Sequence, residues 1–195
     1  MNKRYSTIRM TQLALLIAIE LVMAVTPLGY IMIPPIAATL MHIPVIVGAI
    51  IMGPKAGAAL GTVFGLTSLW KASTQATSPV DLAFSPFVSG KPLQSLIMCM
   101  GPRILLGILA ALFFKAFLEA FHGKEGISIG LAAVVSTICH TVMVLGLLAL
   151  FFSEFGMGVM SVVLSLVTVS SACEMLAAAI ISIAVCIPLR KMLNQ

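Results

Sequence analysis

Arg103 is a single charged residue within a long apolar run, and its guanidinium is the group in this sequence best suited to bind an anion. The run extends from Leu93 to Phe114 and contains no other charge. An arginine within hydrocarbon costs about 3 kcal/mol or more, so it usually has a partner or a task. The chemistry that a planar guanidinium offers is a bidentate grip on a carboxylate.

Two acidic residues, Glu20 and Glu174, also lie inside apolar segments. Arg103 is about ten residues from the start of its run, or roughly 15 Å along a helix. Glu174 is at a similar depth in the last apolar segment. Two interpretations of Arg103 follow, a structural ion pair with Glu174 and an anion site facing a water-filled cavity, and the two can coexist.

Four further polar or aromatic side chains are candidates for contact with a ligand: His42, His140, Trp70 and Tyr30. An intramembrane histidine usually bonds to a neighbouring helix, and no HxxxH or HExxH spacing indicates a metal site. Trp70 and Tyr30 fall at the ends of apolar segments. They are either anchors at the membrane surface or part of the floor of a binding pocket.

Enzyme chemistry is not indicated by any motif. Several serines accompany His140, but no GxSxG-like turn presents one as a nucleophile. The stretch GAIIMGPKAG imitates a phosphate-binding loop, yet Ala56 follows Lys55 where the motif needs Ser or Thr. We therefore expect a binding protein with no cofactor and no metal, and any ATP would bind to another protein.

The composition places these residues in a membrane. Of 195 residues, 61% are hydrophobic and 9% charged, and the mean hydropathy is +1.17. Soluble domains do not have such usage. The apolar runs suffice for five full spans and one short span, which predicts one membrane domain, residues 1–195. The net charge of +5 is scattered singly, without the basic stripe that nucleic acid requires.

The expected fold is an all-α bundle of six transmembrane helices with a short second helix. Prolines and glycines exclude regular helix from residues 27–42 (loop 1) and a membrane span from residues 71–92 (loop 3), and we expect both segments to be long extracellular loops. The helices are expected at Thr7–Val25, Ile43–Met52, Lys55–Trp70, Leu93–Phe117, Ile127–Phe152 and Gly158–Leu189.

The distribution of basic residues predicts cytoplasmic termini. Two lysines fall on the loop 3 side, and eight basic residues fall on the side of the termini. Positive charge in short loops favours the cytoplasm. The eight are Lys3, Arg4, Arg9, Lys55, Lys115, Lys124, Arg190 and Lys191, and the two are Lys71 and Lys91.

Small residues at four-residue spacing mark two helix faces. Ala14 and Ala18 form one, for which packing inside the bundle and docking of a partner are both open. Gly57, Gly61 and Gly65 form the other, for which we expect packing inside the bundle.

This sequence resembles the substrate-binding S components of energy-coupling factor vitamin transporters. The likeness covers almost the whole chain: the six expected helices, the short second helix, long loops 1 and 3, and the Ala14-xxx-Ala18 motif. The segments TPLGYI, MHIPVIVGAIIMGPKAGA, VFGLTSL, FSPF and GPRILLG resemble the pantothenate-type members.

The resemblance implies a multi-pass protein of a prokaryotic cell membrane. Such a protein captures a vitamin from outside, beneath its extracellular loops, and delivers it to a module of one transmembrane coupling subunit and two ATPases. In that family the alanine face is the docking surface for the coupling subunit. This implies that role for Ala14 and Ala18.

The resemblance also assigns a binding site. It implies that Arg103 meets the carboxylate of pantothenate, and we expect supporting contacts from His140, Thr67, Trp70, Tyr30 and His42. One departure is His140, which stands where the family pattern has Asn and whose charge would vary with pH. The alternatives are another vitamin, such as folate or riboflavin, and, in a different class, a stand-alone secondary carrier or an intramembrane enzyme.

Overall fold

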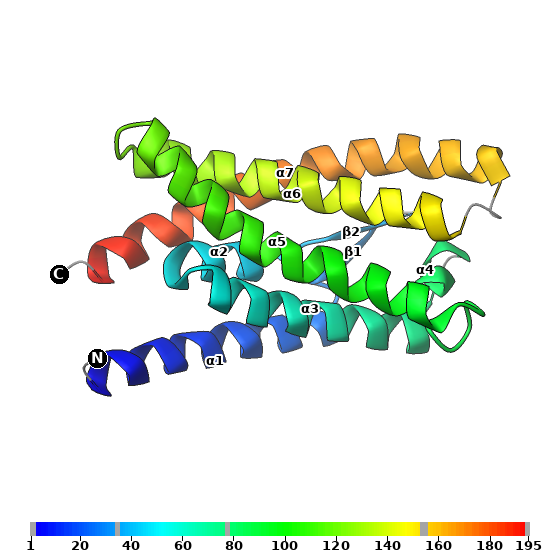
Figure 1. Cartoon of the computed structure of the whole chain (residues 1–195), viewed down its shortest axis with the longest axis horizontal. Coiled ribbons are helices and arrows are strands. Elements are labelled where there is room, and N and C mark those ends of the chain that lie inside the picture. Colours follow the sequence, from blue (N-terminus) through cyan, green and yellow to red (C-terminus); the bar gives the residue numbers. More distant parts are fainter. Residues whose placement is uncertain (1–2, 34–35, 77–78, 153–155, 194–195) are drawn as a thin grey trace.

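The computed structural model describes the backbone of residues 3–33, 36–76, 79–152 and 156–193. The surroundings of side chains are described for residues 7–29, 39–76, 81–152 and 171–192. Within these ranges the chain is a bundle of helices with one small β-hairpin (Figure 1).

The elements follow the expected order. They are α1 (Lys3–Val25), β1 (Tyr30–Ile33), β2 (Ile36–Thr39), α2 (His42–Met52), α3 (Pro54–Thr74), α4 (Pro79–Ala83), α5 (Pro92–Ala120), α6 (Glu125–Phe151) and α7 (Gly156–Leu193). The helical class is confirmed, and each expected helix has a counterpart whose ends differ by at most four residues. The hairpin and α4 were not predicted.

The hairpin occupies most of loop 1. Its strands are antiparallel, and Tyr30 pairs with Thr39. The backbone N–H of Leu40 donates to the carbonyl of Gly29 at 3.1 Å, which closes the open end of the hairpin. Strand β2 packs against α7. Loop 1 is thus held against a long apolar helix of the bundle.

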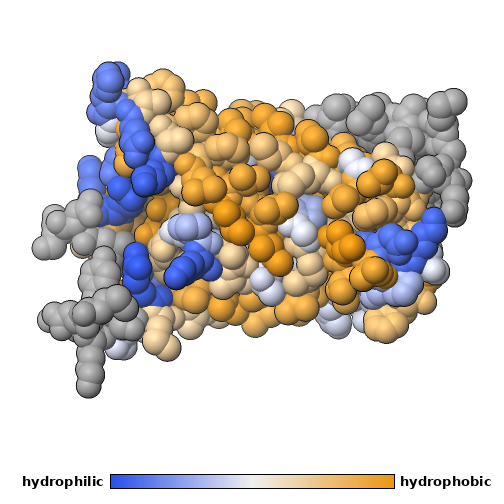
Figure 2. All heavy atoms as spheres, in the orientation of Figure 1, coloured by the Kyte–Doolittle hydropathy of each residue, from blue (hydrophilic) through white to orange (hydrophobic). Residues whose placement is uncertain are grey.

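The exterior of the molecule has the character of a membrane protein. Four helical segments in the described part of the chain are long and apolar enough to cross a bilayer: Thr7–Val25, Pro92–Ala120, Glu125–Phe151 and Ser171–Met192. Figure 2 shows a broad apolar band with hydrophilic residues gathered toward the two ends. The N-terminal end of α1 and the C-terminal end of α7 lie at the same end of the bundle (Figure 1). The count of six crossings stays a prediction.

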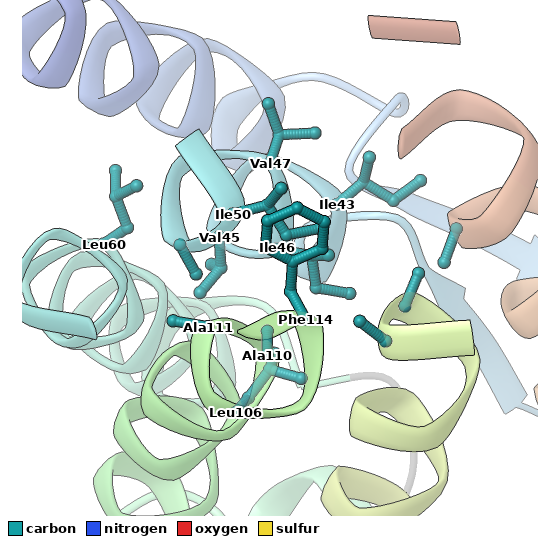
Figure 3. Close-up of a cluster of buried hydrophobic side chains, with 14 of the residues drawn as sticks. Ile43, Val45, Ile46, Val47, Ile50, Leu60, Leu106, Ala110, Ala111 and Phe114 are labelled. Carbon is teal, nitrogen blue, oxygen red and sulfur yellow. The ribbon is translucent and has the colours of Figure 1, made fainter. Parts of the chain in front are cut away.

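Helix α2 is the centre of the hydrophobic core. Residues 42–50 are all buried, as expected of a short helix that is apolar all round. Isoleucines and valines of α2 lie around Phe114, with Leu60 of α3 and Leu106 of α5 in the same cluster (Figure 3). Gly53, with φ 90°, and Pro54 then end α2 and begin α3.

Candidate functional site

Arg103 is buried on α5, with 8% of its surface exposed. Its Nη1 donates a hydrogen bond to the carbonyl of Met98 at 2.7 Å. In a regular helix that carbonyl would accept from the N–H of residue 102, but Pro102 has none. The proline and the arginine of the GPRILLG segment are therefore linked, because the arginine satisfies a carbonyl that the proline leaves open.

Two aromatic rings lie against the guanidinium. The Cζ of Arg103 is 5.5 Å from the ring centroid of Phe64 on α3 and 5.3 Å from that of Phe84, which follows α4. Both distances are within the range of a cation–π interaction. Neither ring was predicted from the sequence, although VFGLTSL and FSPF are among the segments that carry the family resemblance.

Close packing of α3 on α5 fixes the backbone around Arg103. A Cβ on Gly61 would run into the backbone carbonyl of Arg103. In the same way, a Cβ on Gly57 would run into the backbone of Gly107, and a Cβ on Gly107 into that of Gly57. A Cβ on Gly65 would lie 2.7 Å from the sulfur of Met100. The predicted packing role of the glycine face on α3 is confirmed. The face does more than pack, since it places Phe64 beside the arginine.

His140 joins this group from α6. Its ring centroid is 6.1 Å from that of Phe64, and it lies within electrostatic reach of Arg103 and His42. His140 and His42 are both buried, and the Nε2 of each lacks a hydrogen-bond partner among the described residues. Helices α5 and α6 and the start of α2 thus contribute buried nitrogen groups to one region of the bundle.

Glu174 has a partner other than the one considered from the sequence. Its Oε1 accepts a hydrogen bond from the backbone N–H of Thr39, at the end of β2, at 2.7 Å. An ion pair joins Arg190 and Glu125 at 3.0 Å, near the termini. The ion pair of Arg103 and Glu174 stays a prediction. Glu174 holds the end of the loop 1 hairpin to α7.

The other predicted binding residues differ in position. Thr67 is buried on α3, and its hydroxyl donates to the carbonyl of Phe64 at 2.9 Å. Trp70 is 45% exposed, which fits the membrane anchor better than the pocket floor. The backbone of Tyr30 begins β1, but its side chain lies outside the described part of the chain.

The α4–α5 connection (residues 84–91) is fastened to α5 beside this group. The hydroxyl of Ser95 donates to the carbonyl of Ala83 at 2.6 Å, and the thiol of Cys99 donates to the carbonyl of Phe84 at 3.4 Å. Ser95, Cys99 and Arg103 are spaced by four residues, so they share one face of α5. That spacing was the signal in the sequence that could have revealed the contact.

The two alanines of α1 are exposed. Ala14 and Ala18 are on the surface of α1, together with large apolar residues such as Leu15 and Val22. Packing inside this chain does not account for their small size. The face is open to lipid or to another protein.

Comparison with known proteins identifies similar chains. The family of ECF transporter substrate-specific components matches residues 8–189. A relative, the pantothenic acid transporter PanT of Lactococcus lactis subsp. cremoris (strain MG1363), is 36% identical over 168 residues, an alignment that covers 83% of this chain and 82% of that protein. The residues that match the family include every element that contributes to the Arg103 region.

Proposed function

This chain belongs to the substrate-specific component family of ECF transporters, and on that premise we propose that it binds pantothenate for ATP-driven uptake. The similarity to a protein named as a pantothenic acid transporter supports this choice of vitamin. Pantothenate carries one carboxylate, one amide and two hydroxyls on a small apolar frame. A site for it needs one cation, a few hydrogen-bonding groups and apolar walls.

The observation that carries the proposal is the buried guanidinium of Arg103. A cation held within an apolar bundle gains most from a ligand that brings a single negative charge. The Phe64 and Phe84 rings contact the guanidinium through their π faces and supply apolar surface around it. Arg103 is accordingly proposed as the anchor of the carboxylate.

The remaining polar groups suit the uncharged part of the vitamin. His140 and His42 each present a buried ring nitrogen without a partner among the described residues, and Thr67 has a hydroxyl that can still accept. We assign them to the hydroxyls and the amide. Tyr30 stays a proposed contact on the strength of its position in the sequence alone, and Trp70 is proposed as an anchor at the membrane surface.

The protein is proposed to act as one membrane domain in the cell membrane of a prokaryote, with six crossings and both termini in the cytoplasm. It would work with one transmembrane coupling subunit and two ATPases, and would itself be no enzyme. The exposed alanine face of α1, Ala14 and Ala18, is the proposed docking surface for the coupling subunit.

Calorimetry with purified protein tests the assignment of the anchor. We expect Arg103→Ala to weaken pantothenate binding at least about a hundredfold, because a charge-assisted hydrogen bond contributes up to about 3 kcal/mol and a bidentate pair makes two. The matched control is Lys115→Ala, which removes one cation from an exposed position on the same helix. Unchanged affinity in Arg103→Ala would refute the anchor. Tight binding of folate or riboflavin in place of pantothenate would refute the vitamin.

A further inference from the structure

Phe84 links the α4–α5 connection to Arg103. It is the first residue after α4, and its ring lies 5.3 Å from the Cζ of Arg103. Its neighbour in the FSPF segment, Phe87, is 83% exposed. Of these two phenylalanines in one short segment, one contacts the buried cation and the other is on the surface.

The backbone at Phe84 is fixed to the helix that carries Arg103. Ser95 and Cys99 bond to the carbonyls of Ala83 and Phe84, and both belong to the face of α5 that ends in Arg103. The Nζ of Lys91 also donates to the carbonyl of Phe151 at 3.0 Å, which ties the connection to α6. These hydrogen bonds fix the backbone from which the Phe84 ring reaches the guanidinium.

We propose that Phe84 is a positioning residue, which holds the guanidinium of Arg103 in its anion-binding position. The proposal rests on the function proposed above, in which Arg103 binds the carboxylate. It adds a residue that acts through Arg103.

The physical basis is that a guanidinium can contact an aromatic ring through its flat face while its N–H groups donate hydrogen bonds. A cation held over an aromatic ring is attracted by the ring quadrupole, and this contact uses none of its N–H donors in hydrogen bonds. The contact is strongest where water is excluded. The ring thus steadies the arginine without competing for its N–H groups, one of which Nη1 directs to the carbonyl of Met98.

Two ligands separate a role through Arg103 from a general apolar role. The first is pantothenate, and the second is its alcohol analogue, in which a hydroxymethyl group replaces the carboxylate. In Phe84→Leu, which keeps an apolar side chain but removes the ring face, we expect pantothenate to bind about ten- to thirtyfold more weakly. The affinity for the alcohol should change less than about twofold, since that ligand brings no charge to Arg103.

Two further variants complete the experiment. Phe87→Leu is the matched control from the same segment and should bind both ligands like the wild type. Phe84→Tyr keeps an aromatic face and should retain the affinity for pantothenate. All variants are compared as monodisperse full-length protein in the same detergent, so that a variant that does not fold is recognised as such.

The outcomes distinguish the two proposals. Equal weakening of both ligands in Phe84→Leu, or equal losses in Phe84→Leu and Phe84→Tyr, would overturn the positioning role and leave Phe84 a general apolar contact. Retained pantothenate affinity in Phe84→Leu, with a large loss in Arg103→Ala, would overturn only this inference. Wild-type protein that binds the alcohol as tightly as pantothenate would overturn both, because no anion site would exist for Phe84 to position.

Discussion

Pro102 and Arg103 act together in the hydrogen bonding of α5. Proline removes a donor from α5 at the depth where hydrocarbon offers no replacement, and the guanidinium supplies one to Met98. The need to partner an open carbonyl is one reason for an arginine here, alongside the proposed binding of a ligand. The sequence alone suggests only an acidic partner or a ligand, because the i−4 carbonyl freed by a proline is easily overlooked.

The candidate site was predictable in part at this scale. The isolation of Arg103 within an apolar run is enough to single it out, and the two histidines are recognisable as polar side chains in or beside apolar segments. Phe64 and Phe84 were missed because aromatic residues are common in apolar segments. Their contact with the cation depends on how α3 and the α4–α5 connection pack on α5, which spacing within one segment does not encode.

Gly61 tests whether the close approach of α3 and α5 supports Arg103. We expect Gly61→Ala to destabilise the protein by about 1–3 kcal/mol, because the added methyl overpacks the contact with the Arg103 backbone. The affinity for pantothenate should fall with it, since the arginine would shift. Thermal unfolding in detergent and calorimetry measure the two effects.

The matched control for Gly61 lies two residues before Arg103. A Cβ on Gly101 would meet nothing within 4 Å, so Gly101→Ala should leave both stability and affinity close to the wild type. If Gly101→Ala were as harmful as Gly61→Ala, the effect would come from loss of glycine itself rather than from the helix contact.

At the scale of elements, helices were easier to predict than the segment that joins the first two. Long apolar runs bounded by Gly and Pro located every major helix, because length and composition alone determine what can span a bilayer. Loop 1 was predicted only as irregular. Its strands form because β2 packs on α7 and because Glu174 bonds to Thr39, partners that are 135 residues apart.

Glu174 provides a test of how the hairpin is held. In Glu174→Ala we expect the Thr39 amide to exchange its hydrogen about tenfold faster or more, since a hydrogen bond to a carboxylate contributes about 1.5–3 kcal/mol. Pantothenate should also dissociate faster, because loop 1 is less firmly attached. Hydrogen exchange followed by mass spectrometry measures the first effect, and a ligand-release assay the second.

Two control variants accompany Glu174→Ala. Glu174→Gln retains an oxygen acceptor and should remain close to the wild type in both measurements. Glu119→Ala removes a carboxylate from an exposed position on α5 and should change neither. Unaltered exchange at Thr39 in Glu174→Ala would mean that the strand pairing of the hairpin, rather than the carboxylate, holds this end in place.

At the scale of the whole molecule, the groups proposed to bind the vitamin and the residues proposed to bind a partner lie in different places. The polar groups that suit a ligand are inside the bundle, whereas the small residues that suit a partner are outside, on α1. The composition and the distribution of basic residues predicted a membrane protein with both termini on one side. The ends of α1 and α7 do lie at one end of the bundle (Figure 1). Whether Ala14 and Ala18 face inward could not be predicted, because four-residue spacing defines a face but not its direction.

The exposed alanine face of α1 predicts variants that lose transport but still bind pantothenate. We expect Ala14→Trp and Ala18→Trp to abolish co-purification with the coupling subunit and the ATPases, because a bulky ring prevents the close approach of backbones that small residues allow. Both residues are on the surface, away from the core around α2, so the affinity for pantothenate should stay within about twofold of the wild type. Uptake into proteoliposomes that contain the complete module should be lost.

An exposed alanine elsewhere separates docking from a general effect of a new tryptophan in the membrane. Ala149 is exposed on α6, which lies on the side of the bundle away from α1 (Figure 1), so Ala149→Trp should leave complex formation and uptake intact. If both α1 variants assembled normally, the face of α1 would contact only lipid. If all three variants lost the module, the added ring would act through folding or insertion. Loss in the α1 variants alone, with unchanged pantothenate binding, is what docking through Ala14 and Ala18 requires.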